Sequence, residues 1–421
     1  MPKWLIVPGL LAGAALLAVA TAAPAATAGV PARAPALTWS VVHSPNRGAG
    51  GNSFDAVSCV SGHSCAAVGS YLGGGGEQRT LAESWDGTRW SVLPSPNRPS
   101  GGFGNALFGV SCATPRACMA VGASGLAVGA ASGLTGGGAP GPAIGGASRL
   151  TGNPLKTLAE SWDGTRWSVL PSPNRGDGDN FDAVSCVSAD ACMAVGAFGI
   201  STNGFGTLAE SWDGAHWSVL PSPDPVGAGD GFRGVSCTSA DACMAVGLSG
   251  TSDNGPFSTL AELWNGTRWS VVRSPNPVAG SNEFNGVSCV SADACTAVGV
   301  SGTSGGPTTT LIESWNGRRW SVVPSPNGPG LTWLWGVSCA ATDACNAAGL
   351  YFARTGSPRT LIESWDGTRW SMVPTPSPGV ENRVLNGVSC ASATTCTAAG
   401  DFYSRAKAAF RTLIETGTAS G

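Results

Sequence analysis

The sequence is poor in charge, histidine and tyrosine. Only 12% of its residues are charged, the formal net charge is −3, and there are three histidines and three tyrosines. A nucleic-acid binder needs a dense basic stripe to displace phosphate counterions, so we exclude that class. After the first 28 residues no apolar run is long enough to span a bilayer. The motifs HExxH, G-x-S-x-G and the P-loop are also absent.

The N-terminal segment has the three parts of an export signal. Lys3 supplies the positive start, an apolar run follows, and Ala26-Thr27-Ala28 is a small-residue cleavage site. We therefore expect a signal peptide over residues 1–28, a short linker over 29–36, and a secreted, extracellular protein without membrane attachment after cleavage. The alternative is that the apolar run stays as a membrane anchor.

The 14 cysteines form seven pairs, each with the spacing C-x5-C. Paired cysteines in a chain with an export signal predict disulfides. Zinc sites use shorter spacings and further partner ligands, so metal ligation is the weaker interpretation. The predicted bridges join Cys59 to Cys65, Cys112 to Cys118, Cys186 to Cys192, Cys237 to Cys243, Cys289 to Cys295, Cys339 to Cys345 and Cys390 to Cys396.

The cysteine pairs mark a repeat with a period close to 51 residues, which is typical of propellers and solenoids. Each repeat contains four short strand candidates, such as FDAVSC, CMAVG, TLAESW and RWSVL. Asp-Gly or Asn-Gly separates the third from the fourth and predicts a tight hairpin. One interval is longer because of a Gly/Ala-rich insertion, about residues 126–152, which we expect to be a surface loop.

The first and last repeats are incomplete in complementary ways, so together they can close a ring. The chain has a lone fourth strand from Leu37 and a lone third strand, TLIETG, from Thr412. A linear solenoid would need capping repeats instead. We therefore predict an all-β, seven-bladed β-propeller of four-stranded antiparallel blades over residues 37–417, in which the N-terminal strand completes the last blade.

The turn between the third and fourth strands resembles a known propeller motif. Residues 84–90 read SWDGTRW, which is similar to the Asp-box of sialidase-like propellers, Ser-x-Asp-x-Gly-x-Thr-Trp, with one residue missing between Asp and Gly. The paired tryptophans and the glycine that ends the second strand are similar to kelch and galactose-oxidase blades. The resemblance implies a secreted bacterial propeller of that broad class and carries over no catalytic site.

Comparison of the repeats separates a constant framework from variable segments. Val-Ser-Cys and a glutamate on the third strand recur in every repeat. Arginine stands nearby on the fourth strand in five repeats, so we expect a cross-strand ion pair between Glu83 and Arg89 and its equivalents. The connections between blades and between the second and third strands vary strongly. In this topology they share one face, which is where binding sites usually lie.

Catalytic chemistry has little support. A sialidase needs an arginine cluster and a tyrosine nucleophile, and a copper radical oxidase needs tyrosine and histidine ligands; neither set is recognisable. Two carboxylates suffice for glycoside hydrolysis, and the acidic residues near the variable face are Asp55, Asp182, Glu283 and Glu381. We expect no cofactor, with calcium on the oxygen ligands of Asp177, Asp179, Asn180 and Asp182 as the alternative to a solvated acidic turn.

The strongest candidate binding cluster is aromatic and lies in the last two blades. Aromatic faces with a few polar groups suit sugars or peptides, and the competing interpretation is local packing under long loops. The candidate ligand-binding residues are Trp333, Trp335, Tyr351, Phe352, Arg354, Arg383, Phe402, Tyr403 and Arg405.

The sequence therefore favours an exported, monomeric, non-enzymatic propeller that binds a glycan or an extracellular protein through its variable face. A secreted polysaccharide hydrolase or lyase with a carboxylate pair in the central pocket is the second hypothesis. A structural cell-envelope protein is the third.

Overall fold

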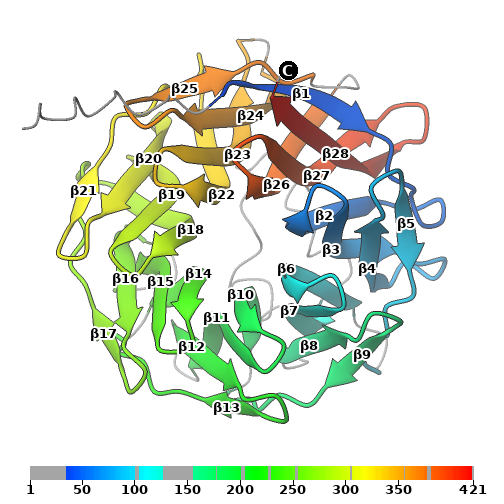
Figure 1. Cartoon of the computed structure of the whole chain (residues 1–421), viewed down its shortest axis with the longest axis horizontal. Helices are drawn as coiled ribbons and strands as arrows, with labels where there is room; N and C mark the ends of the chain where they lie inside the picture. The colour runs from blue at the N-terminus through cyan, green and yellow to red at the C-terminus, as the bar shows by residue number, and fades with distance from the viewer. Residues whose placement is uncertain are drawn as a thin grey trace, which may run out of the picture. The chain divides into compact units, whose positions relative to one another are not determined.

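Seven four-stranded antiparallel sheets form a closed ring, as the repeats predict (Figure 1). The computed structural model describes residues 35–99, 104–126, 155–176, 178–200, 204–225, 229–251, 255–303, 306–354, 356–376 and 381–419, and these contain no helix. The predicted signal peptide and nearly all of the predicted insertion lie outside the described residues.

Each blade runs outward from the axis in chain order, except that β1 is the outer strand of the last blade. The inner strands are β2 (Asn52–Ser61), β6 (Gly104–Thr114), β10 (Asn180–Ser188), β14 (Gly231–Ser239), β18 (Ser281–Ser291), β22 (Thr332–Ala341) and β26 (Glu381–Ser392). The second strands are β3 (Ser64–Leu72), β7 (Ala117–Leu126), β11 (Ala191–Ile200), β15 (Ala242–Ser249), β19 (Ala294–Gly302), β23 (Ala344–Phe352) and β27 (Thr395–Ser404). The third strands are β4 (Gln78–Trp85), β8 (Lys156–Trp162), β12 (Gly204–Trp212), β16 (Ser258–Trp264), β20 (Thr308–Trp315), β24 (Pro358–Trp365) and β28 (Ala409–Ala419). The outer strands are β5 (Trp90–Leu93), β9 (Trp167–Leu170), β13 (Trp217–Val219), β17 (Trp269–Val271), β21 (Trp320–Val322), β25 (Trp370–Val373) and β1 (Leu37–Val42).

The repeated Trp-Asp-Gly turn is held by its aspartate. Oδ1 of Asp86 accepts hydrogen bonds from the backbone N–H of Thr88, the hydroxyl of Thr88 and the backbone N–H of Arg89. Gly87 has φ of 93°, a conformation that glycine adopts without strain. The indole N–H of Trp85 donates to the carbonyl of Gly62 in the C-x5-C loop, so these two turns lie at the same end of the blade.

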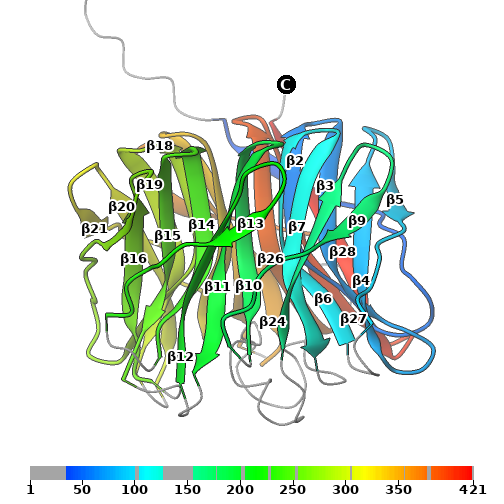
Figure 2. The same cartoon turned by 90° about the horizontal axis from the view of Figure 1, so that it is seen from below.

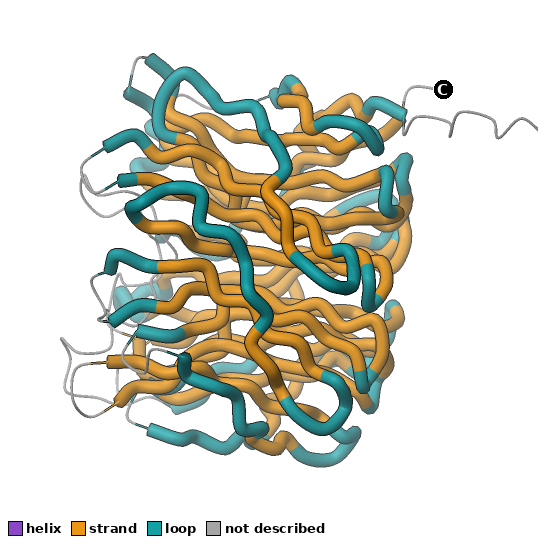
Figure 3. Tube along the Cα trace, turned by 90° about the vertical axis from the view of Figure 1, so that its left-hand side faces the viewer, coloured by secondary structure: helices purple, strands orange, loops and turns teal. Residues whose placement is uncertain are grey.

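The connections at the other end of the ring also contact one another, as predicted. Leu72 at the end of β3 donates a backbone hydrogen bond to Gly51 in the connection from the preceding blade, and Phe352 donates likewise to Leu331. Figures 2 and 3 show strands running between these two ends of the ring, with connections at both.

All seven predicted disulfides are present, each within one blade. Cys59 and Cys65 are directly opposed on β2 and β3, and their Cα atoms are 4.0 Å apart. Seven disulfides indicate folding in an oxidising environment. Within the described part of the chain, no helix is long and apolar enough to cross a membrane.

The repeated serine of Val-Ser-Cys joins neighbouring blades. The backbone N–H of Cys112 donates to Oγ of Ser58 in the preceding blade at 3.0 Å. The same bond recurs at every junction, at 2.9–3.0 Å, around the whole ring. These bonds satisfy partly buried backbone donors and explain why this serine does not vary between repeats.

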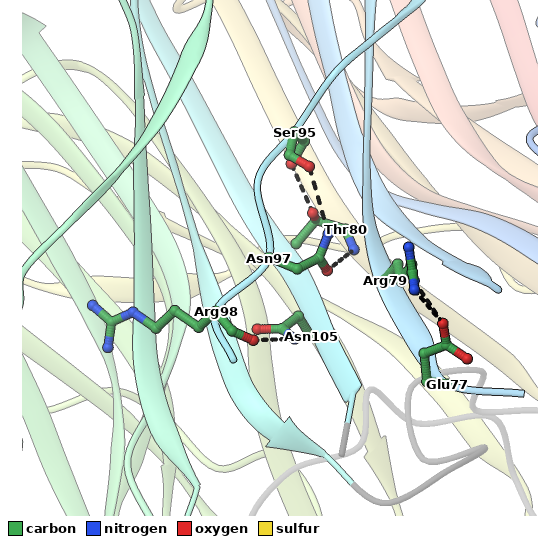
Figure 4. A network of polar contacts seen from close by, with 7 residues as sticks. All are labelled: Glu77, Arg79, Thr80, Ser95, Asn97, Arg98 and Asn105. Atoms are coloured by element: carbon green, nitrogen blue, oxygen red, sulfur yellow. Dashed lines mark hydrogen bonds and ion pairs between the residues drawn. The ribbon is translucent and has the colours of Figure 1, made fainter. Parts of the chain in front are cut away.

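A second set of hydrogen bonds follows the outer strands, where the sequence reads Ser-Pro-Asn in five of the seven repeats. In the first blade Ser95 donates to the hydroxyl of Thr80 at 2.7 Å, and the side-chain oxygen of Asn97 accepts the Thr80 backbone N–H at 3.0 Å (Figure 4). The segment after β5 is thereby bound back onto β4. Asn105 continues the connection by donating to the carbonyl of Arg98 at 3.2 Å.

The predicted ion pair between the third-strand glutamates and the fourth-strand arginines is wrong. Glu160 is fully buried, and its carboxylate accepts a hydrogen bond from Ser95 of the preceding blade at 2.9 Å. Arg89 instead lies 3.7 Å from Asp86 in its own exposed turn. Burial raises the pKa of Glu160 to about 8, against a smaller opposing effect of that hydrogen bond. The repeated glutamate is thus buried between blades, and in four repeats (Glu83, Glu160, Glu313 and Glu363) a serine of the preceding blade donates a hydrogen bond to it.

The N-terminal strand closes the ring. β1 pairs with β28 antiparallel, with Trp39 opposite Gly417. In the complete repeats a second tryptophan stands opposite, as Trp85 does to Trp90, and the two rings lie 5.8 Å apart. A Cβ atom on Gly417 would lie 2.7 Å from the Trp39 ring, so glycine makes room for the indole of the added strand.

Candidate functional site

A β-bulge interrupts every inner strand at the same place. In β2 the pairing passes from Phe54 to Ala56 and leaves Asp55 without a partner on β3. A bulge changes the direction in which the side chain of its extra residue points. The equivalent residues form what we call the axial ring: Asp55, Phe108, Asp182, Arg233, Asn285, Trp335 and Asn386.

The axial ring lies where the inner strands converge. The residue after each bulge is alanine or glycine and abuts its counterpart in the next blade: a Cβ on Gly387 would lie 3.1 Å from Cα of Ala56. Side chains of successive blades contact one another here, since Arg233 donates to Asn285 at 3.0 Å and Asn285 to the carbonyl of Leu334 at 2.9 Å. A small residue is required directly after the bulge, whereas the bulge residue itself differs from blade to blade.

One side of the axial ring carries a charged network. The guanidinium of Arg233 lies 3.3 Å from the carboxylate of Glu283. Asp182 accepts a hydrogen bond from Asn180 at 3.0 Å. Burial raises the pKa of Asp182 to about 6, although the charge of Arg233 and the hydrogen bond from Asn180 act in the opposite direction. Burial also lowers the pKa of Arg233, while Glu283 and Asp182 raise it.

The opposite side is acidic. Asp55 of the first blade lies beside Asp401 of the last blade, on β27, and Ser53 donates to the Asp401 carboxylate at 2.7 Å. Burial, and secondarily the charge of Asp401, raises the pKa of Asp55 well above its usual range. Burial raises the pKa of Asp401 to about 7, against opposing hydrogen bonds from Ser53 and Asn386. Between the two charged sectors stand aromatic members of the ring, Phe108 and Trp335.

The sequence-predicted aromatic residues are only partly brought together. Trp333 is 5% exposed and meets Phe352 edge-on at 5.6 Å, within an apolar cluster that includes Val384 of the last blade. Trp335 is in the axial ring. Tyr403 meets Phe410 edge-on at 5.4 Å, Tyr351 and Phe402 are half-buried, and Arg383 is buried. Arg354 and Arg405 are exposed on turns.

A groove of about 760 Å³ lies beside Tyr351 and Phe352. Its lining comes from the connection 306–309 and from 327–331, which leads into β22. The close approach of Gly328 to Tyr351, where a Cβ would be 2.8 Å from the tyrosine Cβ, places the aromatic residue at its edge.

In the acidic segment considered for calcium, the carboxylate of Asp179 accepts hydrogen bonds from the backbone N–H groups of Arg175 and Gly176. Asn52 and Asn282 occupy the equivalent position in their blades. Each forms hydrogen bonds with the backbone of the connection that leads into its strand. Asp177 lies outside the described residues. Among the residues that are described, no group of three or more His, Cys, Asp or Glu side chains could hold a metal ion.

Of the carboxylates considered for hydrolysis, Asp55 and Asp182 belong to the axial ring, on blades separated by that of Phe108. Glu283 is engaged by Arg233. Glu381 begins β26.

Sequence reasoning missed Asp401. Its signal was a charged residue directly after the glycine of the second strand, where the other repeats have Ser70, Ala123, Ala197, Leu248, Val300 and Leu350.

No family model matches the chain, and no curated protein does. Among solved structures it is similar to YCF48 bound to a D1 peptide, with a TM-score of 0.50 and 12% identity over 93% of this chain and 100% of that one. A Dyadobacter fermentans protein of unknown function gives a TM-score of 0.51 and 11% identity, with coverage of 93% and 100%. YCF48 from Cyanidioschyzon merolae gives 0.49 and 12%, with 90% and 98%. The likeness is one of fold.

Proposed function

We propose that this chain is an exported, non-enzymatic binding propeller that recognises a segment of an extracellular protein at its axial ring and the adjoining variable face. The observation that carries the proposal is the axial ring itself. Its residues change from blade to blade, although the positions on either side of them are nearly constant. Variation confined to one re-aimed side chain in each blade is what a recognition surface on a fixed scaffold requires.

The chemistry of the ring favours a protein over a glycan. It combines two carboxylates, one guanidinium, two carboxamides and two aromatic rings, a mixture suited to the varied side chains of a peptide. A glycan site needs aromatic faces open to the sugar. In the predicted aromatic cluster, Trp333 is buried and covered by Phe352. The similar YCF48 propeller was solved with a D1 peptide, which is compatible with peptide binding on this fold.

The proposal can be tested with the disulfide-bonded propeller immobilised against a random peptide display library and, in parallel, a glycan array. We expect enrichment of peptides, and loss of their binding in the triple variant Phe108→Ser, Arg233→Asn, Trp335→Ser. The matched control replaces Val41, Val271 and Val322 with serine, because these side chains are 43%, 48% and 44% exposed on outer strands.

Binding that survives the axial variant, or binding to glycans alone, would contradict the proposal. Thermal unfolding of both triple variants establishes that the ring is intact in each.

A further inference from the structure

The junction between the first and last blades differs from its neighbours by one buried carboxylate. Asp401 is 6% exposed and packs against Ser53 of the next blade. The equivalent contact between the sixth and last blades is made by Leu350 and Val384, which belong to one apolar cluster. The propeller therefore does not need a charge at this position to join two blades.

The fold supplies little to compensate this carboxylate. Oδ1 of Asp401 and Oδ2 of Asp55 are buried and have no hydrogen-bond partner. The polar groups that face the pair are Ser53 and Asn386, and the flanking members of the axial ring are Asn386 and Phe108. Within the described part of the chain, no Lys, Arg or His forms an ion pair with either aspartate. Buried carboxylates normally have such a partner.

We propose that Asp55 and Asp401 form a receptor for the ammonium or guanidinium group of a lysine or arginine side chain on the protein partner. Asp55 is half-buried in the axial ring, whereas Asp401 beside it is buried. Calcium takes six to eight oxygen ligands, which exceeds what these two carboxylates and their neighbours offer. A single cationic side chain can form a charge-assisted hydrogen bond with the half-buried Asp55, and the charge of Asp401 beside it adds to the attraction.

The inference rests on the proposed function, since it names the chemistry that the partner brings. It also predicts how the affinity depends on pH. A cation binds the ionised carboxylates, whereas protonation of Asp401, whose pKa burial raises to about 7, removes the attraction. Binding is therefore strong in mildly alkaline solution and weak in mildly acidic solution.

The test uses pentalysine amide as probe, titrated into the folded propeller at pH 8 and pH 5.5 and followed by calorimetry and by NMR of the aspartate carboxyl carbons. We expect shifts at Asp55 and Asp401, and at least a tenfold loss of affinity at pH 5.5. The double variant Asp55→Asn, Asp401→Asn should lose at least tenfold at pH 8. The double variant Asp241→Asn, Asp293→Asn makes the same change in charge on exposed loops and should bind normally.

A second variant separates binding from folding. Ser53→Val with Asp401→Leu copies the Val384 and Leu350 contact of the neighbouring junction. We expect it to lose pentalysine binding while its melting temperature rises. A fall in both would indicate a structural role and overturn the inference.

Equal losses in the two Asp-to-Asn double variants would also overturn it, because bulk charge would then explain binding. Calcium that shifts the same carboxyl signals and displaces pentalysine would overturn the choice of an organic cation. Failure of the peptide selection, by contrast, tests the proposed function alone, since the pentalysine titration does not depend on a selected peptide.

Discussion

The backbone N–H of Cys59 donates a hydrogen bond of 2.9 Å to Oγ of Ser389, which follows it by 330 residues. This bond is the last of the set that links each blade to the next, and it joins the final blade to the first. It shows that the ring is fastened at the inner strands as well as at the outer strand β1.

Removal of that hydroxyl should weaken the whole ring. Ser389→Ala leaves the partly buried N–H of Cys59 without its acceptor, which costs up to about 3 kcal/mol. We expect a lower free energy of unfolding by that amount in chemical denaturation. Ser218→Ala, on an exposed outer-strand position, should change it by less than about 0.5 kcal/mol. Similar values for the two would contradict the role given to the inter-blade bonds.

The stability of the propeller should fall as the pH rises from about 5 to 9. Burial raises the pKa of Glu363 to about 8, whereas an unfolded glutamate titrates near about 4.3. The folded protein therefore holds protons that the unfolded chain has released, and this contribution is fully present below the unfolded pKa and lost as the pH rises through the folded one. Each such glutamate contributes a slope of up to about 1.4 kcal/mol per pH unit.

Melting temperatures measured across that range check the sign, and Glu363→Gln should flatten the curve because glutamine keeps an oxygen for Ser325 and does not ionise. The control is Asp86→Asn, in an exposed turn where the hydrogen bond from Thr88 and those from the backbone lower the pKa to about 2. Asn265 and Asn316 occupy this position in other blades. That variant should leave the slope above pH 5 unchanged.

A single disulfide should contribute measurably. Cys289 and Cys295 close a loop of seven residues, for which the chain-entropy model gives about 2 kcal/mol. The double variant with alanine at both positions should unfold at lower denaturant concentration by a corresponding amount. Peptide mapping without reduction should find the remaining six bridges unchanged, and bridges between blades in the variant would contradict local pairing.

The charge of Arg233 should be visible in the titration of Asp182. Because that charge lowers the pKa of Asp182 against the effect of burial, Arg233→Met should raise the pKa above about 6. NMR of the Asp182 carboxyl carbon against pH measures the shift directly. Arg268→Met, at an exposed turn, is the control. An unchanged Asp182 titration in Arg233→Met would mean that the axial charges do not interact.

The sequence was sufficient to predict the architecture because its signals are local and repeated. The C-x5-C spacing determined the bridges, the Asp-Gly turn determined the outer hairpin, and the lone strand at Leu37 implied closure with Thr412 onward. The Glu83 to Arg89 ion pair was wrong because a periodic pattern shows that two residues recur together, not which neighbour each one contacts. The glutamate contacts the segment that follows the outer strand of the preceding blade, and the arginine stays with its own turn.

The site was harder to predict, because a bulge adds one residue that changes the direction of a side chain and leaves no periodic trace. Asp55 and Trp335 are both one step before a small residue in their strands, yet only the register with the second strand shows that they occupy equivalent positions. Asp401 was within reach of sequence reasoning, since it is charged where the other repeats carry uncharged residues. Its approach to Ser53 joins positions 348 residues apart.

The pairing of β1 with β28 also determines the order of events during synthesis. A chain that grows from its N-terminus makes β1 before any other strand and its partner β28 after all of them. The six blades between them can fold as they emerge, whereas the seventh must wait for the last of its strands. Until then β1, which carries Trp39, has no partner strand, because β28 has not yet been synthesised. Completion of the ring is therefore a late, single event, and a ribosome that stalls before Thr412 leaves an open arc with two unpaired sides.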